Sequence, residues 1–182
     1  MGSSITVAAT DVADSDFGVD PRALANFILD TFENRGISIS NLSLQKYMYF
    51  CHGWCWAHFD RALIDREFEA WQFGPVSRLV YSQFSASRRK PIATRAHVVT
   101  PLGATSSIIP YAFSATMNVF LRHVLEKYWN LTAFQLSDLT HDVGSPWWRV
   151  RHDEEFERLG QAKIPDRFIS AWFKESLDVS KQ

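Results

Sequence analysis

Residues 41–59, NLSLQKYMYFCHGWCWAHF, decide the fold of this chain. Apolar side chains recur at helical spacing along the stretch, and further aromatic residues lie off that stripe, so the predicted helix is apolar nearly all round. A helix of this kind is typically buried on every side. Ser40 or Asn41 can cap its first turn. We therefore expect a central helix around which the rest of the chain packs.

Other helices are predicted on both sides of this stretch. Each combines apolar residues at i, i+3 and i+4 with a start signal, such as Asp20-Pro21 or the capping box Thr132-x-x-Gln135. The remaining predicted starts are Gly74-Pro75, Ser114 and Pro165-Asp166. A short strand is expected at residues 97–100 and a loop over 103–110. The fold class is therefore mainly α: a single compact helical domain of about six helices with at most a short β element.

The length of 182 residues suits one domain. Residues 1–19 contain three aspartates and no basic residue, so we expect a flexible acidic leader there. The helical domain is expected over 20–176 and a C-terminal tail over 177–182.

The charge balance limits the classes of partner. Nineteen Lys and Arg face twenty Asp and Glu, a net charge of −1, which argues against nucleic-acid binding through a general cationic excess. The sequence shows no signal peptide and no apolar run of membrane-spanning length, so we expect a cytoplasmic protein without a membrane partner. An aromatic content of 14% suits a dense core or a protein-binding surface and also allows a homo-oligomer.

A zinc site is one interpretation of the Cys and His residues in 51–58. On a helix, Cys51, Cys55 and His58 share one side, and thiolate and imidazole groups are good zinc ligands. The interpretation that we favour is that both cysteines are compact core residues of the buried helix, since free Cys behaves as a small apolar group. We therefore assign no metal ligand and no cofactor.

No complete catalytic set is evident. His141, near Trp147, could serve as a general base, but the sequence supplies no obvious nucleophile, and we favour a structural role at a helix end. Asp65, Glu67 and Glu69 fit a solvated rim, and the basic run 88–90 fits a solvated loop. We therefore assign no catalytic residue and expect that the chain is not an enzyme.

Three linked motifs resemble the Panacea domain family, which includes the SocA-like antitoxins and many phage-associated proteins. The first two motifs comprise Leu44-Gln45-Lys46, Tyr49-Phe50, Glu69-Ala70-Trp71, Gly74-Pro75-Val76 and Tyr81. The third comprises Leu136 to His141 with Ser145-Pro146-Trp147 and is followed by a closing segment from Ile164 to Phe173. The resemblance covers residues 21–175.

The resemblance implies a mostly helical bacterial antitoxin that neutralises a cognate toxin by direct binding. In the SocA-like branch it also implies an adaptor that delivers the toxin to a protease, which would be a second partner. The partner-binding residues that we predict from the motifs are Lys46, Trp71, Phe73, Arg78, Tyr81 and His141. Two alternatives stay open: a phage- or secretion-associated accessory binding protein without a toxin, and a small zinc-dependent hydrolase.

Overall fold

The computed structural model describes residues 12–99, 106–153 and 162–179. Helices account for more than half of the chain, which confirms the mainly α class. The helices are α1 (Pro21–Glu33), α2 (Asn41–Phe59), α3 (Arg78–Phe84), α4 (Ala115–Tyr128), α5 (Ala133–Asp138), α6 (Pro146–Arg151) and α8 (Asp166–Val179). The strands are β1 (Phe68–Trp71), β2 (Gly74–Val76), β3 (His97–Val99), β4 (Ser106–Ile108) and β5 (Lys163–Ile164).

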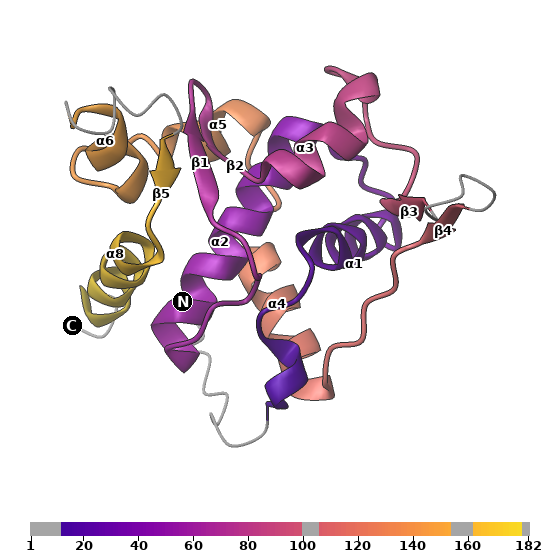
Figure 1. Ribbon diagram of the computed structural model, residues 1–182, viewed down its shortest axis with the longest axis horizontal. Helices are drawn as coiled ribbons and strands as arrows, with labels where there is room; N and C mark the ends of the chain where they lie inside the picture. The colour runs from indigo at the N-terminus through magenta and orange to yellow at the C-terminus, as the bar shows by residue number, and fades with distance from the viewer. Residues whose placement is uncertain (1–11, 100–105, 154–161, 180–182) are drawn as a thin grey trace.

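Helix α2 is the centre of the domain, as predicted. It runs through the middle of the molecule, with α1 and α8 on opposite sides and the β1–β2 hairpin beside its first turns (Figure 1). The side chain of Ser40 accepts a hydrogen bond from the backbone N–H of Ser43 at 3.2 Å, which caps the helix. Its residues are buried on all sides from Ser43 to Cys55, so neighbouring elements pack against every face.

The predicted capping signals start helices where expected. Asp20 accepts a hydrogen bond from the N–H of Arg22 at the start of α1, and Pro21 is its first residue. Ser114 caps α4, and Thr132 and Gln135 form the predicted capping box of α5. These starts need only local residues, which is why the sequence locates them well.

Two predicted features around β structure are wrong. Gly74-Pro75 begins no helix: residues 74–76 form β2, which pairs with β1 across a two-residue turn at Gln72 and Phe73, and α3 begins at Arg78. The backbone of Gly74 has φ +98°, which is incompatible with a right-handed helix. Residues 103–110, predicted as loop, contain β4, whose partner is the predicted strand β3.

The three-stranded sheet joins distant parts of the sequence. Its order is β2-β1-β5, and both pairs are antiparallel, with Phe68 opposite Ile164. The sheet therefore attaches the segment that leads into α8 to the hairpin. None of the helices among the described residues has both the length and the apolarity to cross a membrane.

The structure describes part of the expected leader and part of the expected tail. Within residues 12–19 of the expected leader, Asp16 is fully buried, and its carboxylate accepts hydrogen bonds from the N–H and the hydroxyl of Ser114 at 2.7 and 2.6 Å. Val19 also bridges to Ile64. At the other end α8 continues to Val179, past the predicted start of a tail at 177. Residues 1–11 and 180–182 lie outside the described residues.

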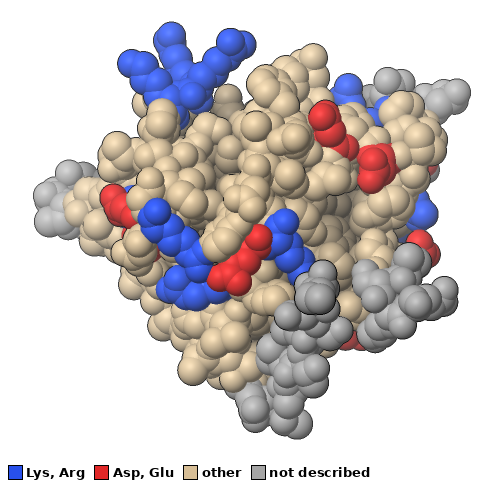
Figure 2. Space-filling model, turned by 180° about the vertical axis from the view of Figure 1, so that it is seen from behind, with Lys and Arg blue, Asp and Glu red and all other residues tan. Residues whose placement is uncertain are grey.

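One corner of the surface is strongly basic. A group of Lys and Arg side chains projects from the molecule where α3 and the short helix η3 (Ser85–Ser87) lie, at the upper left of Figure 2. Arg88, Arg89 and Lys90 follow η3 and are exposed. Within the described part of the chain none of the three forms an ion pair, as expected for a solvated loop.

Candidate functional site

The first half of α2 holds the hairpin and the start of α3 from beneath. The side-chain carbonyl of Gln45 accepts from the N–H of Ser77 at 2.8 Å, and the Nζ of Lys46 donates to the carbonyl of Pro75 at 3.0 Å. One turn earlier, Asn41 donates to the carbonyl of Tyr81 at 3.1 Å. Polar side chains of an otherwise apolar helix thus satisfy the backbone of the segment above it, because buried peptide groups need partners.

The segment that follows α4 holds the same hairpin from its other side. Three successive turn carbonyls, those of residues 71–73, each contact a side chain from residues 137–147. Trp147 donates its indole N–H to the carbonyl of Trp71 at 2.7 Å, and the hydroxyl of Ser137 donates to that of Phe73 at 2.8 Å. The Nε2 of His141 lies 3.3 Å from the carbonyl of Gln72, and its Nδ1 lies 2.6 Å from that of Ser137. The conformation of the turn is therefore fixed by side chains of both neighbouring segments.

Lys46 and Gly74 lie close together beneath the turn. The side chain of Lys46 is fully buried, and burial lowers its pKa from 10.5 to about 7 because the charged amine loses its water. A Cβ on Gly74 would lie 2.5 Å from the hydroxyl of Thr140 and 2.7 Å from the Nζ of Lys46. Only a glycine leaves room for both polar groups.

A Lys46→Met variant is expected to change how stability depends on pH. Between pH 7 and 10.5 the unfolded chain carries a proton on Lys46 that the folded chain releases, so this residue makes the free energy of unfolding rise with pH. The destabilising contribution is complete below pH 7 and disappears above 10.5. In urea titrations between these limits, wild type should gain about 1 kcal/mol per pH unit relative to Lys46→Met. Parallel pH profiles would contradict the buried position of the amine.

Trp71, Arg78 and Tyr81 form a cluster on the outer side of the hairpin. Arg78 donates two hydrogen bonds to the carboxylate of Glu69, at 2.8 and 2.7 Å, and the indole N–H of Trp71 donates to the same carboxylate at 2.7 Å. The rings of Trp71 and Tyr81 lie 4.8 Å apart. Burial alone would raise the pKa of Glu69, but the hydrogen bonds from Arg78 and Trp71 outweigh it and lower that pKa.

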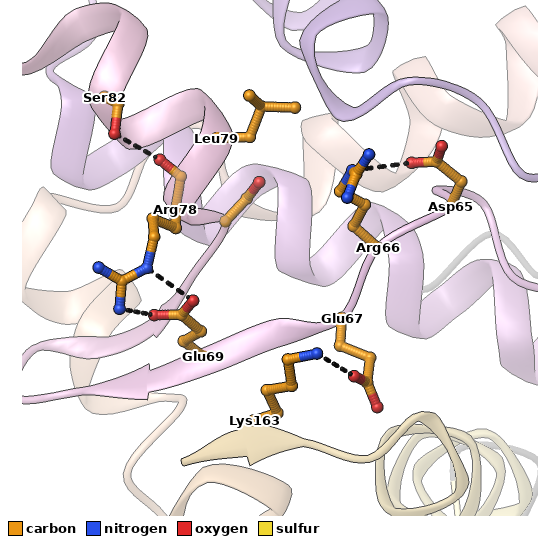
Figure 3. A pocket seen from close by; sticks show the side chains of 9 residues that line it. Asp65, Arg66, Glu67, Glu69, Arg78, Leu79, Ser82 and Lys163 are labelled. Carbon is orange, nitrogen blue, oxygen red and sulfur yellow. Dashed lines mark hydrogen bonds and ion pairs between the residues drawn. The ribbon is translucent and has the colours of Figure 1, made fainter. Parts of the chain in front are cut away.

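A groove of about 610 Å³ continues from this cluster along β1. Figure 3 shows Arg78 of α3 facing Glu69 of β1, and Lys163 of β5 facing Glu67, with Nζ and Oε2 3.2 Å apart. The acidic residues predicted as a solvated rim therefore line the groove, each paired with a cation. Because each carboxylate has a cationic partner, the groove is polar but holds little net charge. Ion pairs at the surface contribute about 0–1 kcal/mol each to stability.

The structure brings all six predicted partner-binding residues to one region. Phe73 is 56% exposed at the tip of the turn, and Tyr81 is 38% exposed. Lys46 differs from the others, because an amine that is fully buried is not available to a partner. Lys46 supports the turn from beneath through its bond to Pro75. Both ring nitrogens of His141 likewise lie within hydrogen-bond distance of backbone carbonyls, those of Ser137 and Gln72.

Sequence reasoning missed the residues that support the turn. Glu69 accepts hydrogen bonds from Trp71 and Arg78, and Ser137 and Trp147 donate to carbonyls of the turn. Gln45 accepts from Ser77 directly after the hairpin, and Thr140 lies close beside Gly74. All five residues lie inside the quoted motifs. A polar pair, Gln45 and Lys46, on an otherwise apolar helix was the available signal. Buried polar groups need a partner, so the pair indicated a backbone segment packed against that helix.

The cysteines lie in the hydrophobic core, which confirms their interpretation as compact core residues. Cys51 and Cys55 are fully buried, and burial raises the pKa of both thiols. The Nδ1 of His58 lies 3.0 Å from the carbonyl of Trp54. Across the described ranges, no three or more His, Cys, Asp or Glu residues are grouped so that they could hold a metal ion.

Comparisons with known proteins agree with the motifs. A family model described as "Antitoxin SocA-like, Panacea domain" matches residues 44–148, which include the hairpin, α3 and the segment that supports the turn. Antitoxin SocA of Caulobacter vibrioides (strain NA1000 / CB15N) is 39% identical over 129 residues, which are 71% of this chain and 69% of that protein. No solved structure matches the chain. The chain therefore belongs to the family of SocA-like antitoxins with a Panacea domain.

Proposed function

We propose that this protein is an antitoxin that neutralises a cognate toxin by binding it through the surface around the hairpin turn. This turn surface consists of Trp71, Phe73, Arg78 and Tyr81, with His141 and Lys46 as positioning residues. The observation that carries the proposal is that the family's motif residues converge on one turn and fix its backbone, while Phe73 at its tip stays exposed.

The chemistry of the turn surface supports binding. Aromatic and Arg side chains supply most hot spots of protein interfaces, because they combine large apolar area with directed hydrogen bonds. A turn held by four side chains also loses little conformational freedom on binding, which lowers the entropic cost of association. A stable interface needs about 800 Å² per partner, so we expect the contact to extend from the turn onto the neighbouring elements.

The test is a growth-rescue assay in a bacterial host. The chain is co-expressed with the product of the neighbouring gene, and wild type should restore growth. Phe73→Asp should reduce rescue by about 100-fold in colony count, since a hot-spot residue contributes about 2 kcal/mol or more and the charge adds a desolvation cost. Val119→Asp, on the 61% exposed Val119 of α4, is the matched control and should rescue like wild type.

Two outcomes would contradict the proposal. Lethality that persists while wild-type chain is present and folded would exclude the antitoxin role with that partner. Rescue by Phe73→Asp at the wild-type level would exclude the turn surface as the binding site. Circular dichroism and urea unfolding of both variants separate loss of binding from loss of fold.

The proposal includes delivery of the bound toxin to a protease, as the family resemblance implies. The half-life of the toxin in the same cells tests this step. Delivery should shorten the half-life several-fold when wild-type chain is present, and Phe73→Asp should restore the longer half-life. A toxin that is neutralised and remains stable would limit the function to direct blocking.

A further inference from the structure

A second group of exposed apolar side chains adjoins the turn. Phe134, Leu139 and Val143 are between 41% and 79% exposed, and together with Phe73 we call them the α5 patch. Of the large apolar residues that remain exposed in the described chain, these four lie on α5, on the turn after it, and on the hairpin bonded to it. Exposed apolar side chains gathered on neighbouring elements are typical of interaction sites.

A hydrogen bond places the tip of the hairpin, with Phe73, beside α5. Ser137 bonds to the carbonyl of Phe73 at 2.8 Å and lies one helical turn after Phe134. With 3.6 residues per turn, Phe134, Asp138 and Leu139 share an arc of about 140° on α5, and the structure leaves that arc exposed. Leu136, on the opposite side of α5, is buried in the core. The outer face of α5 therefore has no partner within the described chain.

The charges beside this face are acidic. Asp138 and Asp142 are exposed, and neither carboxylate pairs with a cation among the residues that the structure describes. Arg149, which follows the same turn, donates to the carbonyl of Gly144 and lies over the ring of Phe168 on α8. Figure 2 views the molecule from the side of α5 and shows acidic side chains over this region, with uncharged surface toward the middle of the view.

We propose that the α5 patch is the part of the interface that binds an apolar segment of the toxin carrying Lys or Arg side chains. The partner's apolar residues pack on Phe73, Phe134 and Val143, and its cations pair with Asp138 and Asp142. Complementary charge at the rim of an apolar contact selects the partner and raises the association rate. That the partner is a toxin rests on the proposed function. That the bound segment is apolar and cationic is inferred from the apolar and acidic side chains of this surface.

The chemistry is tested first without the toxin. The probe is a fluorescently labelled helical peptide with Leu on one face and Lys on the other, compared with the same pattern of Leu and Glu. Fluorescence anisotropy with the full chain should show binding of the Leu–Lys peptide at least about tenfold tighter than that of the Leu–Glu peptide. Phe134→Ser combined with Val143→Ser should weaken Leu–Lys binding by about tenfold or more, and Asp138→Lys with Asp142→Lys should do the same and reduce its salt dependence.

Val119→Ser on α4 is the matched control and should bind the peptide like wild type. Equal affinity for both peptides, or equal loss in the control and in the Phe134→Ser/Val143→Ser variant, would overturn the proposal.

The same double variant is then tested in the rescue assay. Full rescue together with loss of peptide binding would show that the patch does not contact the toxin, and the turn surface would still stand. Failure of wild type to rescue would remove the proposed function alone, because the peptide result is independent of it.

Discussion

A Gly74→Ala variant is expected to lose about 3 kcal/mol of unfolding free energy and, with it, the native conformation of the hairpin turn. Two costs add up. A side chain at φ +98° is strained by about 1–2 kcal/mol, and the new Cβ would displace the Nζ of Lys46 and the hydroxyl of Thr140. Displacement breaks the bond from Lys46 to Pro75, and a buried polar group without a partner costs about 1–3 kcal/mol. Urea unfolding followed by circular dichroism measures the loss.

Gly36→Ala is the matched control for this variant. Gly36 also has a positive φ, +69°, but an added Cβ there meets nothing within 4 Å. Its substitution should therefore cost only the backbone strain, about 1 kcal/mol, and leave rescue of growth intact. Equal losses in the two variants would show that the space under the turn is not limiting.

A Gly53→Ala variant is expected to lose about 2 kcal/mol through the contact of α2 with α8. The added Cβ would lie between 2.2 and 2.5 Å from three atoms of the Phe173 ring, closer than any real contact. In an isolated helix the same change stabilises by up to about 1 kcal/mol, so a net loss requires that overpacking exceeds this gain. Hydrogen exchange should show the loss of protection concentrated in α8.

A double-mutant cycle separates this contact from other effects. Phe173→Leu removes part of the ring and costs stability by itself, but it also makes room for the new methyl group. The double variant Gly53→Ala/Phe173→Leu should be at least about 1 kcal/mol more stable than the sum of the single losses predicts. Additive losses of unfolding free energy would mean that Phe173 of α8 does not pack against Gly53.

Much of the site was predictable as a list of residues, but not as an arrangement. The motifs selected Trp71, Phe73, Arg78, Tyr81 and His141, and the structure places them around one hairpin. Lys46 shows the limit of that reasoning, because a lysine in a motif resembles a binding residue until its burial is known. The hairpin itself was also missed, since its backbone depends on side chains from residues about 30 and 65 positions away.

The sequence by itself determined the features that depend on neighbours along the chain. The buried helix from Asn41 to Phe59 follows from its apolar composition, and the caps at Ser40, Asp20 and Thr132 follow from short polar side chains at helix starts. The tertiary structure alone decided the β1–β2 hairpin, the packing of Asp16 against Ser114, and the pairing of β1 with β5. The turn of the hairpin is bonded to Lys46 and Ser137, Asp16 to Ser114, and β1 to β5, so each depends on a partner that is remote in sequence. The spacing of residues along the chain does not identify such partners.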